Sequence, residues 1–239
     1  MDYKNHIQHY KNDAEYFDYF ENNRISEQEI RRRYQQYFHL YKLKPGDKFL
    51  EIGAGAGFAL KYVERTDCSY IPVDISAKNV GRLRQKITKQ IYPASGDVFQ
   101  LPFHSNTFDF ILMAEVMEHL GSPEDALKEL YRILKPGGSI VISVPYKEKI
   151  SYQLCIHCNK PTPTNAHLHS FNESKLKNLI SGNGFSLIKI TTCLNKITNR
   201  LHLNLPLKFL PFTIWKILDS AANLVTDKPA SYVILVKKK

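Results

Sequence analysis

The strongest constraint on the fold is an alternation of short apolar runs with segments that fit helices, from Lys48 onward. Helices fit, for example, at Ala77–Thr88 and Pro123–Leu134. This alternation is typical of a parallel sheet covered by helices. The predicted strands are Lys48–Ile52, Ser69–Val73, Gln90–Ala94, Phe108–Met113, Ser139–Val144, Phe185–Thr192 and Ala230–Val236. The sequence therefore predicts a doubly wound α/β sheet, mostly parallel, with an antiparallel last strand.

The length of 239 residues suits one domain with insertions. We divide it into an N-terminal helical cap (1–43), a core (44–144) and two insertions (145–171 and 193–229). Two helices are expected in the cap, the second opened by a capping box at Ser26–Glu29. Ligands bind beyond the carboxyl ends of strands in such sheets. If the sixth strand is parallel and the last antiparallel, both insertions leave from that edge, and we expect them and the N-terminal helices to cap an active site.

A glycine-rich turn follows the first predicted strand. It reads Phe49-Leu50-Glu51-Ile52-Gly53-Ala54-Gly55-Ala56-Gly57. Glycines allow a tight bend and let a ligand approach the backbone. Dinucleotide sites use Gly-x-Gly-x-x-Gly, but here the third glycine comes one residue early and Phe58 takes the expected place.

Acidic residues follow the next three strands. Asp74, with Ile75 after it, ends the second strand, where a carboxylate can accept hydrogen bonds from both ribose hydroxyls. Asp97 and Val98 follow the third strand, where an acid and a backbone amide can bind adenine. Glu115 follows the fourth strand. Before the fifth strand, Leu134-Lys135-Pro136-Gly137-Gly138 predicts a helix end and a turn.

These four segments, in this order, resemble the class I S-adenosylmethionine-dependent methyltransferases. The resemblance is to the branch that includes the ubiquinone and menaquinone biosynthesis enzymes, and it covers about residues 48–146. It implies a Rossmann-like fold and S-adenosylmethionine as cofactor. By resemblance, the cofactor contacts are Glu51, Gly53, Gly55, Gly57, Asp74, Ile75, Asp97, Val98 and Glu115. The branch varies widely in substrate.

Two other classes remain open from the sequence. A nicotinamide oxidoreductase would also place an acid at Asp74, although the early third glycine disfavours it. A scaffold that binds S-adenosylmethionine without turnover would carry the same motifs.

Two residues are candidates for a catalytic role. His119 could act as a general base or simply pack beside the cofactor. Tyr146, at the carboxyl end of the fifth strand, could contact substrate or fill the cap. Asp109 is interpreted as structural.

Cysteines and histidines in the first insertion suggest a structural zinc ion. The predicted ligands are Cys155, Cys158, His167 and His169, since two thiolates and two imidazoles suit tetrahedral zinc. The Cys-x2-Cys half has zinc-knuckle spacing, but His-x-His is less usual, and His157 could replace one ligand. His167 also matches a His-x-x-x-Phe landmark of the resembling enzymes, so free or redox-active cysteines remain the alternative.

The second insertion is apolar and basic. Leu201–Val225 contains leucines, phenylalanines and isoleucines interrupted by Pro206 and Pro211. We favour a core-facing lid helix, with a lid for a lipid-like substrate or a membrane contact as the alternative.

Charge is unevenly distributed. The net charge is +10, and residues 151–239, with 12 Lys or Arg and three acids, carry +9 of it. This predicts a small or lipid-like anionic substrate, with nucleic acid, or simply a solvated surface that aids solubility, as the alternatives. No long apolar run predicts a membrane span, and the polar start and the few cysteines suggest a cytoplasmic protein.

Overall fold

The computed structural model describes residues 6–239 except positions 19, 22, 87–90 and 157. Its centre is a seven-stranded sheet in the order β3-β2-β1-β4-β5-β9-β8. The strands are β1 (Lys48–Ile52), β2 (Ser69–Asp74), β3 (Ala94–Ser95), β4 (Phe108–Ala114), β5 (Leu134–Pro145), β8 (Phe185–Asn195) and β9 (Pro229–Lys238). β9 runs antiparallel to both β5 and β8, so β8 is parallel to β5. The predicted doubly wound sheet is confirmed.

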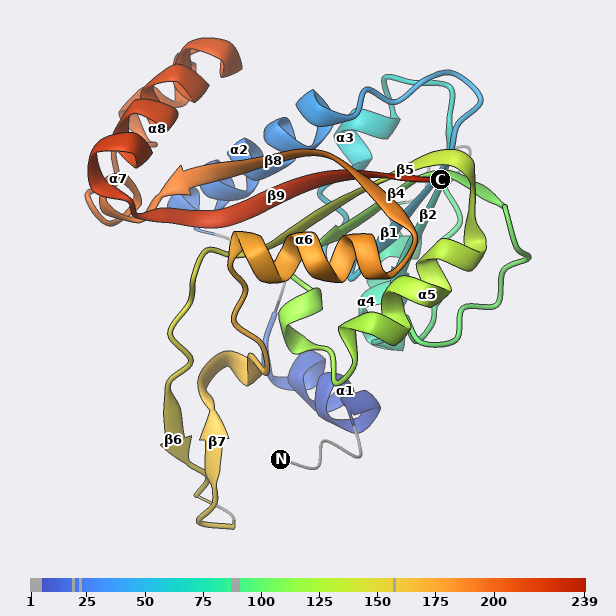
Figure 1. Cartoon of the computed structure of the whole chain (residues 1–239). Helices are drawn as coiled ribbons and strands as arrows, with labels where there is room; N and C mark the ends of the chain where they lie inside the picture. The colour runs from blue at the N-terminus through green and yellow to red at the C-terminus, as the bar shows by residue number, and fades with distance from the viewer. Residues whose placement is uncertain (1–5, 19, 22, 87–90, 157) are drawn as a thin grey trace.

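Helices cover both faces of this sheet (Figure 1). One apolar core lies under α5 (Pro123–Ile133) and α6 (Glu173–Gly182). The other lies under α2 (Arg24–Leu40), α3 (Leu60–Val63) and the start of α8 (Phe212–Thr226). The remaining helices are α1 (His6–Tyr16), α4 (Ala77–Arg84), α7 (Lys196–Arg200) and the 3₁₀ helices η1 (Met117–His119), η2 (Thr164–Ala166) and η3 (Pro206–Phe209).

Helix α5 illustrates how the sequence builds these layers. Its first turn is capped by Ser122, whose side chain accepts a hydrogen bond from the backbone N–H of Asp125, and Pro123 occupies the start of the helix. Its apolar side chains recur at helical spacing and are buried: Ala126, Leu127, Leu130 and Ile133. This stripe faces the sheet and anchors the helix to the core.

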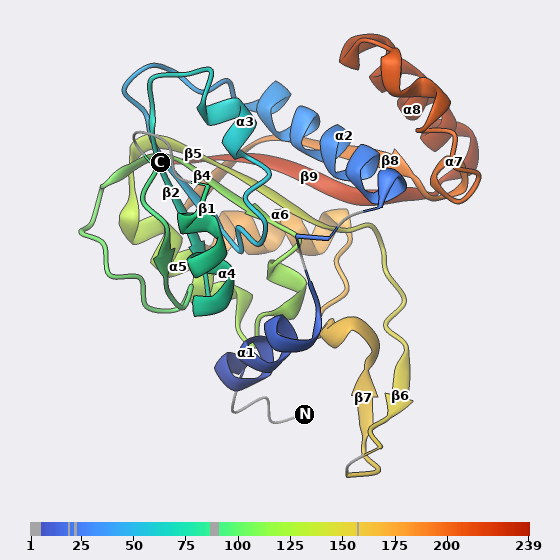
Figure 2. The same ribbon diagram turned by 180° about the vertical axis from the view of Figure 1, so that it is seen from behind.

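Both insertions leave from the edge formed by the carboxyl ends of the parallel strands (Figures 1 and 2). The first forms a hairpin of β6 (Tyr152–Leu154) and β7 (Pro161–Pro163), which extends away from the sheet. The second contains α7, η3 and α8, beyond the end of β8. Among the described residues, no helix combines the length and apolar character that a membrane span requires.

Several local predictions are wrong in detail. Helix α2 begins at Arg24, ahead of the predicted capping box, because the side chain of Asn23 accepts the N–H groups of Ile25 and Ser26. The third strand is reduced to β3 and one bridge between Ile91 and Tyr70. Gln90 and Thr88, the predicted ends of that strand and of the preceding helix, lie outside the described residues.

Strand β5 begins at Leu134, where the sequence predicted a turn. Leu134 pairs with Phe108, and the register shifts before Phe110 pairs with Ser139. The extra residues, with Gly137 at φ +74°, form a bulge, so the strand continues through both glycines.

The core-facing orientation predicted for the apolar residues of the second insertion holds only in part: Leu207, Leu210 and Phe212 pack against the core, but most apolar residues of α8 do not. Trp215 is buried, but Ile214, Ile217 and Leu218 are exposed. The face of α8 that packs against the sheet carries Asp219 and Asn223. These polar side chains can be buried because they form hydrogen bonds with residues at the end of β8.

Candidate active site

The glycine turn after β1 makes a close backbone cradle. Gly53 and Gly57 have φ values of +70° and +73°. A Cβ at Gly53 would lie 2.5 Å from Val116 Cγ2, and one at Gly57 would lie 2.5 Å from Leu83 Cδ2. Gly55, at φ +47°, instead faces open space, with nothing within 4 Å of a Cβ built there. The turn therefore requires glycine for packing on two sides and leaves room for a ligand at its middle.

Asp74 ties the end of β2 to this turn. Its Oδ2 accepts a hydrogen bond from the Gly55 N–H at 2.9 Å, and its Oδ1 accepts one from the Ser76 N–H at 2.9 Å. Burial raises the pKa of Asp74, while these hydrogen bonds and one from Asn79 act to lower it. Ile75, next in the chain, is half-buried. The carboxylate is therefore fixed beside the cradle.

Helix α1 crosses the same edge. His6 Nε2 lies 2.8 Å from Asp97 Oδ2, and the other oxygen of Asp97 accepts the N–H of Phe99 at 3.1 Å. Val98 is buried between these positions. Helix α1 thus lies at this edge through a contact with Asp97 that had no signal in the sequence, and its role as a cap stays a prediction. Two ion pairs extend the contact, Lys78–Glu15 at 3.1 Å and Arg82–Asp18 at 2.6 Å.

Glu51 is buried beneath α2. Its carboxylate accepts hydrogen bonds from the hydroxyls of Tyr34, at 2.6 Å, and Tyr70. Burial raises its pKa to about 7, although both tyrosine hydroxyls act to lower it. Its side chain thus connects β1 to α2 and β2, and its predicted contact with cofactor stays a prediction.

Glu115, at the end of β4, has a strained backbone. Its φ is +54°, which is uncommon for a residue other than glycine. Residues with such backbone angles cluster at functional sites. Ser143 donates a hydrogen bond to one carboxylate oxygen, and Arg33 lies 3.3 Å from the other. Tyr37 in turn donates to Ser143 at 3.0 Å. Helix α2 and strand β5 therefore hold Glu115 at the carboxyl edge of the sheet.

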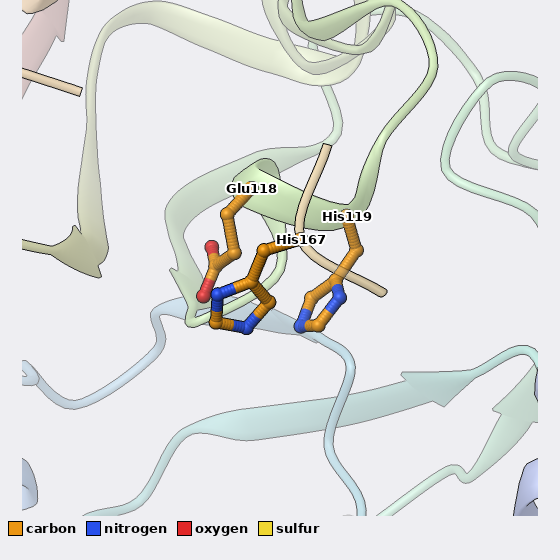
Figure 3. Close-up of side chains that lie close together, drawn as sticks. All are labelled: Glu118, His119 and His167. Carbon is orange, nitrogen blue, oxygen red and sulfur yellow. The ribbon is translucent and has the colours of Figure 1, made fainter. Parts of the chain in front are cut away.

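A compact polar cluster lies next to Glu115, on η1 and the segment after η2. Ligand atoms of Glu118, His119 and His167 all lie within 4.8 Å of one another (Figure 3). The two imidazole rings meet edge to face, with their centroids 4.6 Å apart. Glu118 is 1% exposed, and its Oε2 is buried with no hydrogen-bond partner in the part of the chain that the structure describes. Such an orphaned buried carboxylate oxygen needs a compensating group.

Backbone hydrogen bonds build this cluster. The carbonyl oxygen of Glu118 accepts the N–H groups of Leu168, at 2.8 Å, and His169, at 3.2 Å. This pairing places the ring of His167 against that of His119. Glu148 interacts with Nδ1 of His167. The sequence singled out both histidines but gave no signal that they meet, because 47 residues separate them.

His119 is a neutral imidazole at neutral pH. Burial, followed by the neighbouring His167, lowers its pKa to about 4, although its contact with the Ala166 carbonyl acts to raise it. Tyr146 lies at the end of β5, where its hydroxyl donates to Asp227 and its ring packs on Tyr232, with centroids 4.5 Å apart. The catalytic roles of His119 and Tyr146 stay predictions. Asp109 accepts the Lys48 N–H and pairs with Lys135, in agreement with a structural role.

The four predicted zinc ligands are not brought together. Cys155 and Cys158 lie at the end of the β6–β7 hairpin, and no group of three metal-binding side chains among the described residues contains either of them. His167 instead joins Glu118 and His119, while Nε2 of His169 lies 2.8 Å from the carbonyl oxygen of Leu120. His157, the predicted substitute, lies outside the described residues.

Comparison with known proteins agrees with this geometry. A family model described as a methyltransferase domain matches residues 22–190. The chain is 34% identical over 110 residues to the ubiquinone/menaquinone biosynthesis C-methyltransferase UbiE of Neisseria gonorrhoeae, covering 44% of this chain and 45% of that protein. It is 30% identical over 129 residues to the sterol 24-C-methyltransferase of Schizosaccharomyces pombe, covering 47% and 34% of the two chains. The chain thus spans less than half the length of these curated relatives.

Solved structures share the fold at low identity. An S-adenosylmethionine-dependent methyltransferase from Mesorhizobium loti matches with a TM-score of 0.64 and 13% identity, over 87% of this chain and 98% of that one. The [4+2]-cyclase SpnF matches with a TM-score of 0.65 and 17% identity, over 92% and 86%. The fold and the cradle at its edge define a class I methyltransferase architecture. Because the family model matches well over half of the chain, this chain belongs to the methyltransferase-domain family.

Proposed function

We propose that the protein transfers the methyl group of S-adenosylmethionine to a small or lipid-like acceptor. The observation that carries this proposal is the carboxyl edge of the sheet, where the Gly55 N–H of an open cradle donates to Asp74 and where Asp97 follows the neighbouring strand β3. An anchored carboxylate at Asp74 suits ribose hydroxyls. An adenine amino group at Asp97 would share that carboxylate with His6.

The cofactor supplies an activated methyl group, so the chain needs to align an acceptor and exclude water. Helix α1 covers the edge and limits access of solvent to it. Glu115 directly follows β4 at this edge and is held by Arg33 and Ser143. We assign these groups to orientation of the acceptor, with oxygen, nitrogen and carbon nucleophiles all compatible with the site.

A lipid-like acceptor is supported by the relatives and by the second insertion. The names of the relatives refer to a sterol and to quinones, both of which are apolar molecules. The insertion adds exposed apolar side chains at the same edge of the sheet. The net charge of +9 in residues 151–239 favours an acceptor with a negative group. Unpaired, buried Cys68 and Cys193 agree with a cytoplasmic location.

Isothermal titration with S-adenosylmethionine and S-adenosylhomocysteine tests the cofactor first. Binding of both, without binding of a nicotinamide dinucleotide, is expected. Transfer of labelled methyl to extracted lipids would then support the acceptor class. Incorporation into RNA, with binding that weakens steeply with salt, would favour a nucleic-acid enzyme instead. Cofactor binding without any transfer would favour a scaffold that binds S-adenosylmethionine. The similarity to the [4+2]-cyclase SpnF indicates that this fold also supports other reactions.

A metal ion forms the second part of the proposal. We assign it to Glu118, His119 and His167, because their ligand atoms converge and Glu118 Oε2 has no partner among the described residues. A carboxylate and two imidazoles suit zinc and similar divalent ions. The knuckle-like spacing of Cys155 and Cys158 supports zinc on the hairpin as the competing position.

Elemental analysis of protein purified without chelator separates the two positions. About one equivalent of zinc is expected in the unmodified protein, retained in a Cys155→Ser/Cys158→Ser double variant and lost in Glu118→Gln. Loss in the double variant alone would move the ion to the hairpin. Far less than one equivalent in the unmodified protein would argue against a bound metal.

A further inference from the structure

Helix α8 turns its polar side toward the protein. Trp215, Asp219 and Asn223 recur every four residues and are all buried. Asp219 Oδ2 accepts the backbone N–H of Leu194 at 3.2 Å, and Asn223 Oδ1 accepts a hydrogen bond from the Asn195 side chain at 2.8 Å. These directed hydrogen bonds fix the rotation of the helix about its axis, since another rotation would leave buried polar groups unpaired.

The Trp215 contact fixes the same orientation. Its indole N–H donates to Asn204 Oδ1 at 2.9 Å, and the guanidinium of Arg32 lies 5.0 Å from the centre of the ring. Arg32 also donates to the carbonyl oxygens of Leu207 and Leu210, which precede α8. The segment is therefore docked on α2 as well as on β8.

The opposite side of α8 is apolar and exposed. We call this side the outer face, and its residues are Ile214, Ile217, Leu218, Leu224 and Val225. Counted from Ile214, the other four lie three, four, ten and eleven residues along the helix, so the five form one stripe. Ile217, Leu224 and Val225 are 69%, 87% and 84% exposed. Figures 1 and 2 both show α8 at the periphery of the molecule, with no other element over its far side.

A continuous apolar stripe of this kind marks an interaction surface. Isolated exposed leucines are ordinary, but here a whole helical face is exposed while polar residues of the same helix are buried. The family match ends at residue 190, so α8 lies outside the part of the chain that the methyltransferase-domain model describes. No residue of the outer face belongs to the glycine cradle or to the cluster of Glu118, His119 and His167.

The segment that carries the outer face has an excess of positive charge, which indicates what the face binds. The second insertion contains five cationic residues and two acids: Lys196, Arg200, Lys208, Lys216 and Lys228, with Asp219 and Asp227. Asp219 is buried beside Lys216, and Asp227 accepts from Tyr146 and lies 3.4 Å from Lys147. An apolar stripe within a basic segment complements acyl chains and anionic headgroups. An apolar groove on a protein would not require the excess of positive charge.

The position and length of α8 fit a helix that lies on a bilayer. It has 15 residues, whereas a span requires about 20. It follows the carboxyl end of β8, which is parallel to β5, so it leaves the sheet from the same edge as the cofactor cradle. A membrane under α8 would lie at the edge of the sheet where the acceptor is expected.

We propose that the outer face of α8 binds the protein peripherally to membranes that contain anionic lipid. This inference does not depend on methyl transfer, because binding can be measured without cofactor or acceptor. It adds a docking surface that brings the active-site edge to a lipid-like substrate.

Flotation with vesicles tests the proposal. Vesicles of phosphatidylcholine with phosphatidylglycerol are expected to bind the protein, and phosphatidylcholine alone should bind it more weakly. Replacing Leu224 with Asp, or Ile217 with Asp, should lower partitioning about ten-fold or more, since each side chain inserts into the acyl region. The matched control is Ile188→Asp, an exposed aliphatic residue of β8 outside the outer face, which should bind as the unmodified protein does.

Thermal melting and S-adenosylmethionine titration of the variants exclude misfolding as the cause. Equal partitioning of Leu224→Asp and the unmodified protein would overturn the proposal, as would the absence of any vesicle binding. Sedimentation equilibrium tests whether a second copy of this chain, and not a membrane, covers the outer face. A dimer of the unmodified protein that Leu224→Asp dissociates would overturn the proposal in favour of a contact between two copies of this chain.

Discussion

Helices α5 and α8 are both amphipathic and both pack on the sheet, but they present opposite faces to it. In α5 the apolar residues Leu127 and Leu130 are fully buried, and Glu124, Asp125 and Lys128 face solvent. In α8 the polar residues Asp219 and Asn223 are buried, and the outer face is apolar. Amphipathic spacing therefore identifies a helix but does not decide which face is inside. The partners available on the sheet decide that.

The largest effect is expected when one aliphatic residue in each helix is replaced by aspartate. Leu127→Asp in α5 places a charge in the apolar core and should lower the free energy of unfolding by more than about 4 kcal/mol. Ile217→Asp in α8 should change it by no more than about 0.5 kcal/mol. Urea unfolding followed by circular dichroism measures both. Similar losses in the two variants would mean that the outer face is packed in solution.

A second test asks whether the glycine cradle and the outer face of α8 act independently of each other. Gly55→Val places a side chain in the open cradle at positive φ, and Asp74→Ala removes the anchored carboxylate. Each should weaken S-adenosylmethionine binding about a hundred-fold or more in calorimetry. Leu224→Asp on the outer face is the control and should bind cofactor normally. Loss of cofactor binding in that control would mean that α8 and the cradle are coupled.

Two buried carboxyl groups, Glu51 beneath α2 and Asp219 in α8, should make the free energy of unfolding depend on pH. Burial raises the pKa of Glu51 to about 7, above its ordinary value of 4.5, so the native protein binds the proton more tightly than the unfolded chain. The resulting stability is complete below about pH 4.5 and is lost as the pH rises through about 7. Unfolding at about pH 5 and pH 8 should differ by up to about 3 kcal/mol from this group.

Glu51→Gln should remove most of that difference. Asp219→Asn in α8 should remove less, since Lys216 and the Leu194 N–H oppose the increase that burial causes in the pKa of Asp219. A pH profile that Glu51→Gln leaves unchanged would contradict the assignment.

The smallest expected effect concerns the inverted face itself. Asn223→Leu makes α8 more apolar overall, yet it removes one of the two oxygens that accept hydrogen bonds from the Asn195 side chain and leaves only that of Thr226. We expect a loss of about 1–2 kcal/mol in the free energy of unfolding. A stabilised Asn223→Leu protein would mean that hydrophobicity, and not hydrogen-bond partners, determines the orientation of α8.

Regular features of the fold could be predicted from the sequence because they depend on local periodicity. Six of the seven predicted strands overlap strands of the structure over most of their length, and the glycine turn lies where its spacing placed it. Local backbone details were harder. Asn23 supplies the cap of α2, and the bulge at Gly137 carries β5 through an apparent turn, because both depend on a choice between competing hydrogen bonds.

The site was predicted in part for a similar reason. Asp74 and the cradle follow from strand ends, which meet at one edge in any sheet of this kind. The convergence of His167 with Glu118 and His119 depends on two backbone hydrogen bonds between distant segments, and sequence spacing carries no information about these. The cysteine pair instead suggested a local site, because its spacing is visible in the chain.

Helix α1 also has a consequence for the residence time of the cofactor. Its cover over the edge depends on His6–Asp97, Lys78–Glu15 and Arg82–Asp18, and the last two pairs are exposed. Exposed ion pairs contribute little to stability and weaken in salt. A cover held this weakly opens by local motion, far faster than the whole domain unfolds. Stopped-flow displacement of S-adenosylhomocysteine should therefore become faster as the ionic strength rises, so the product can leave without any large rearrangement of the sheet.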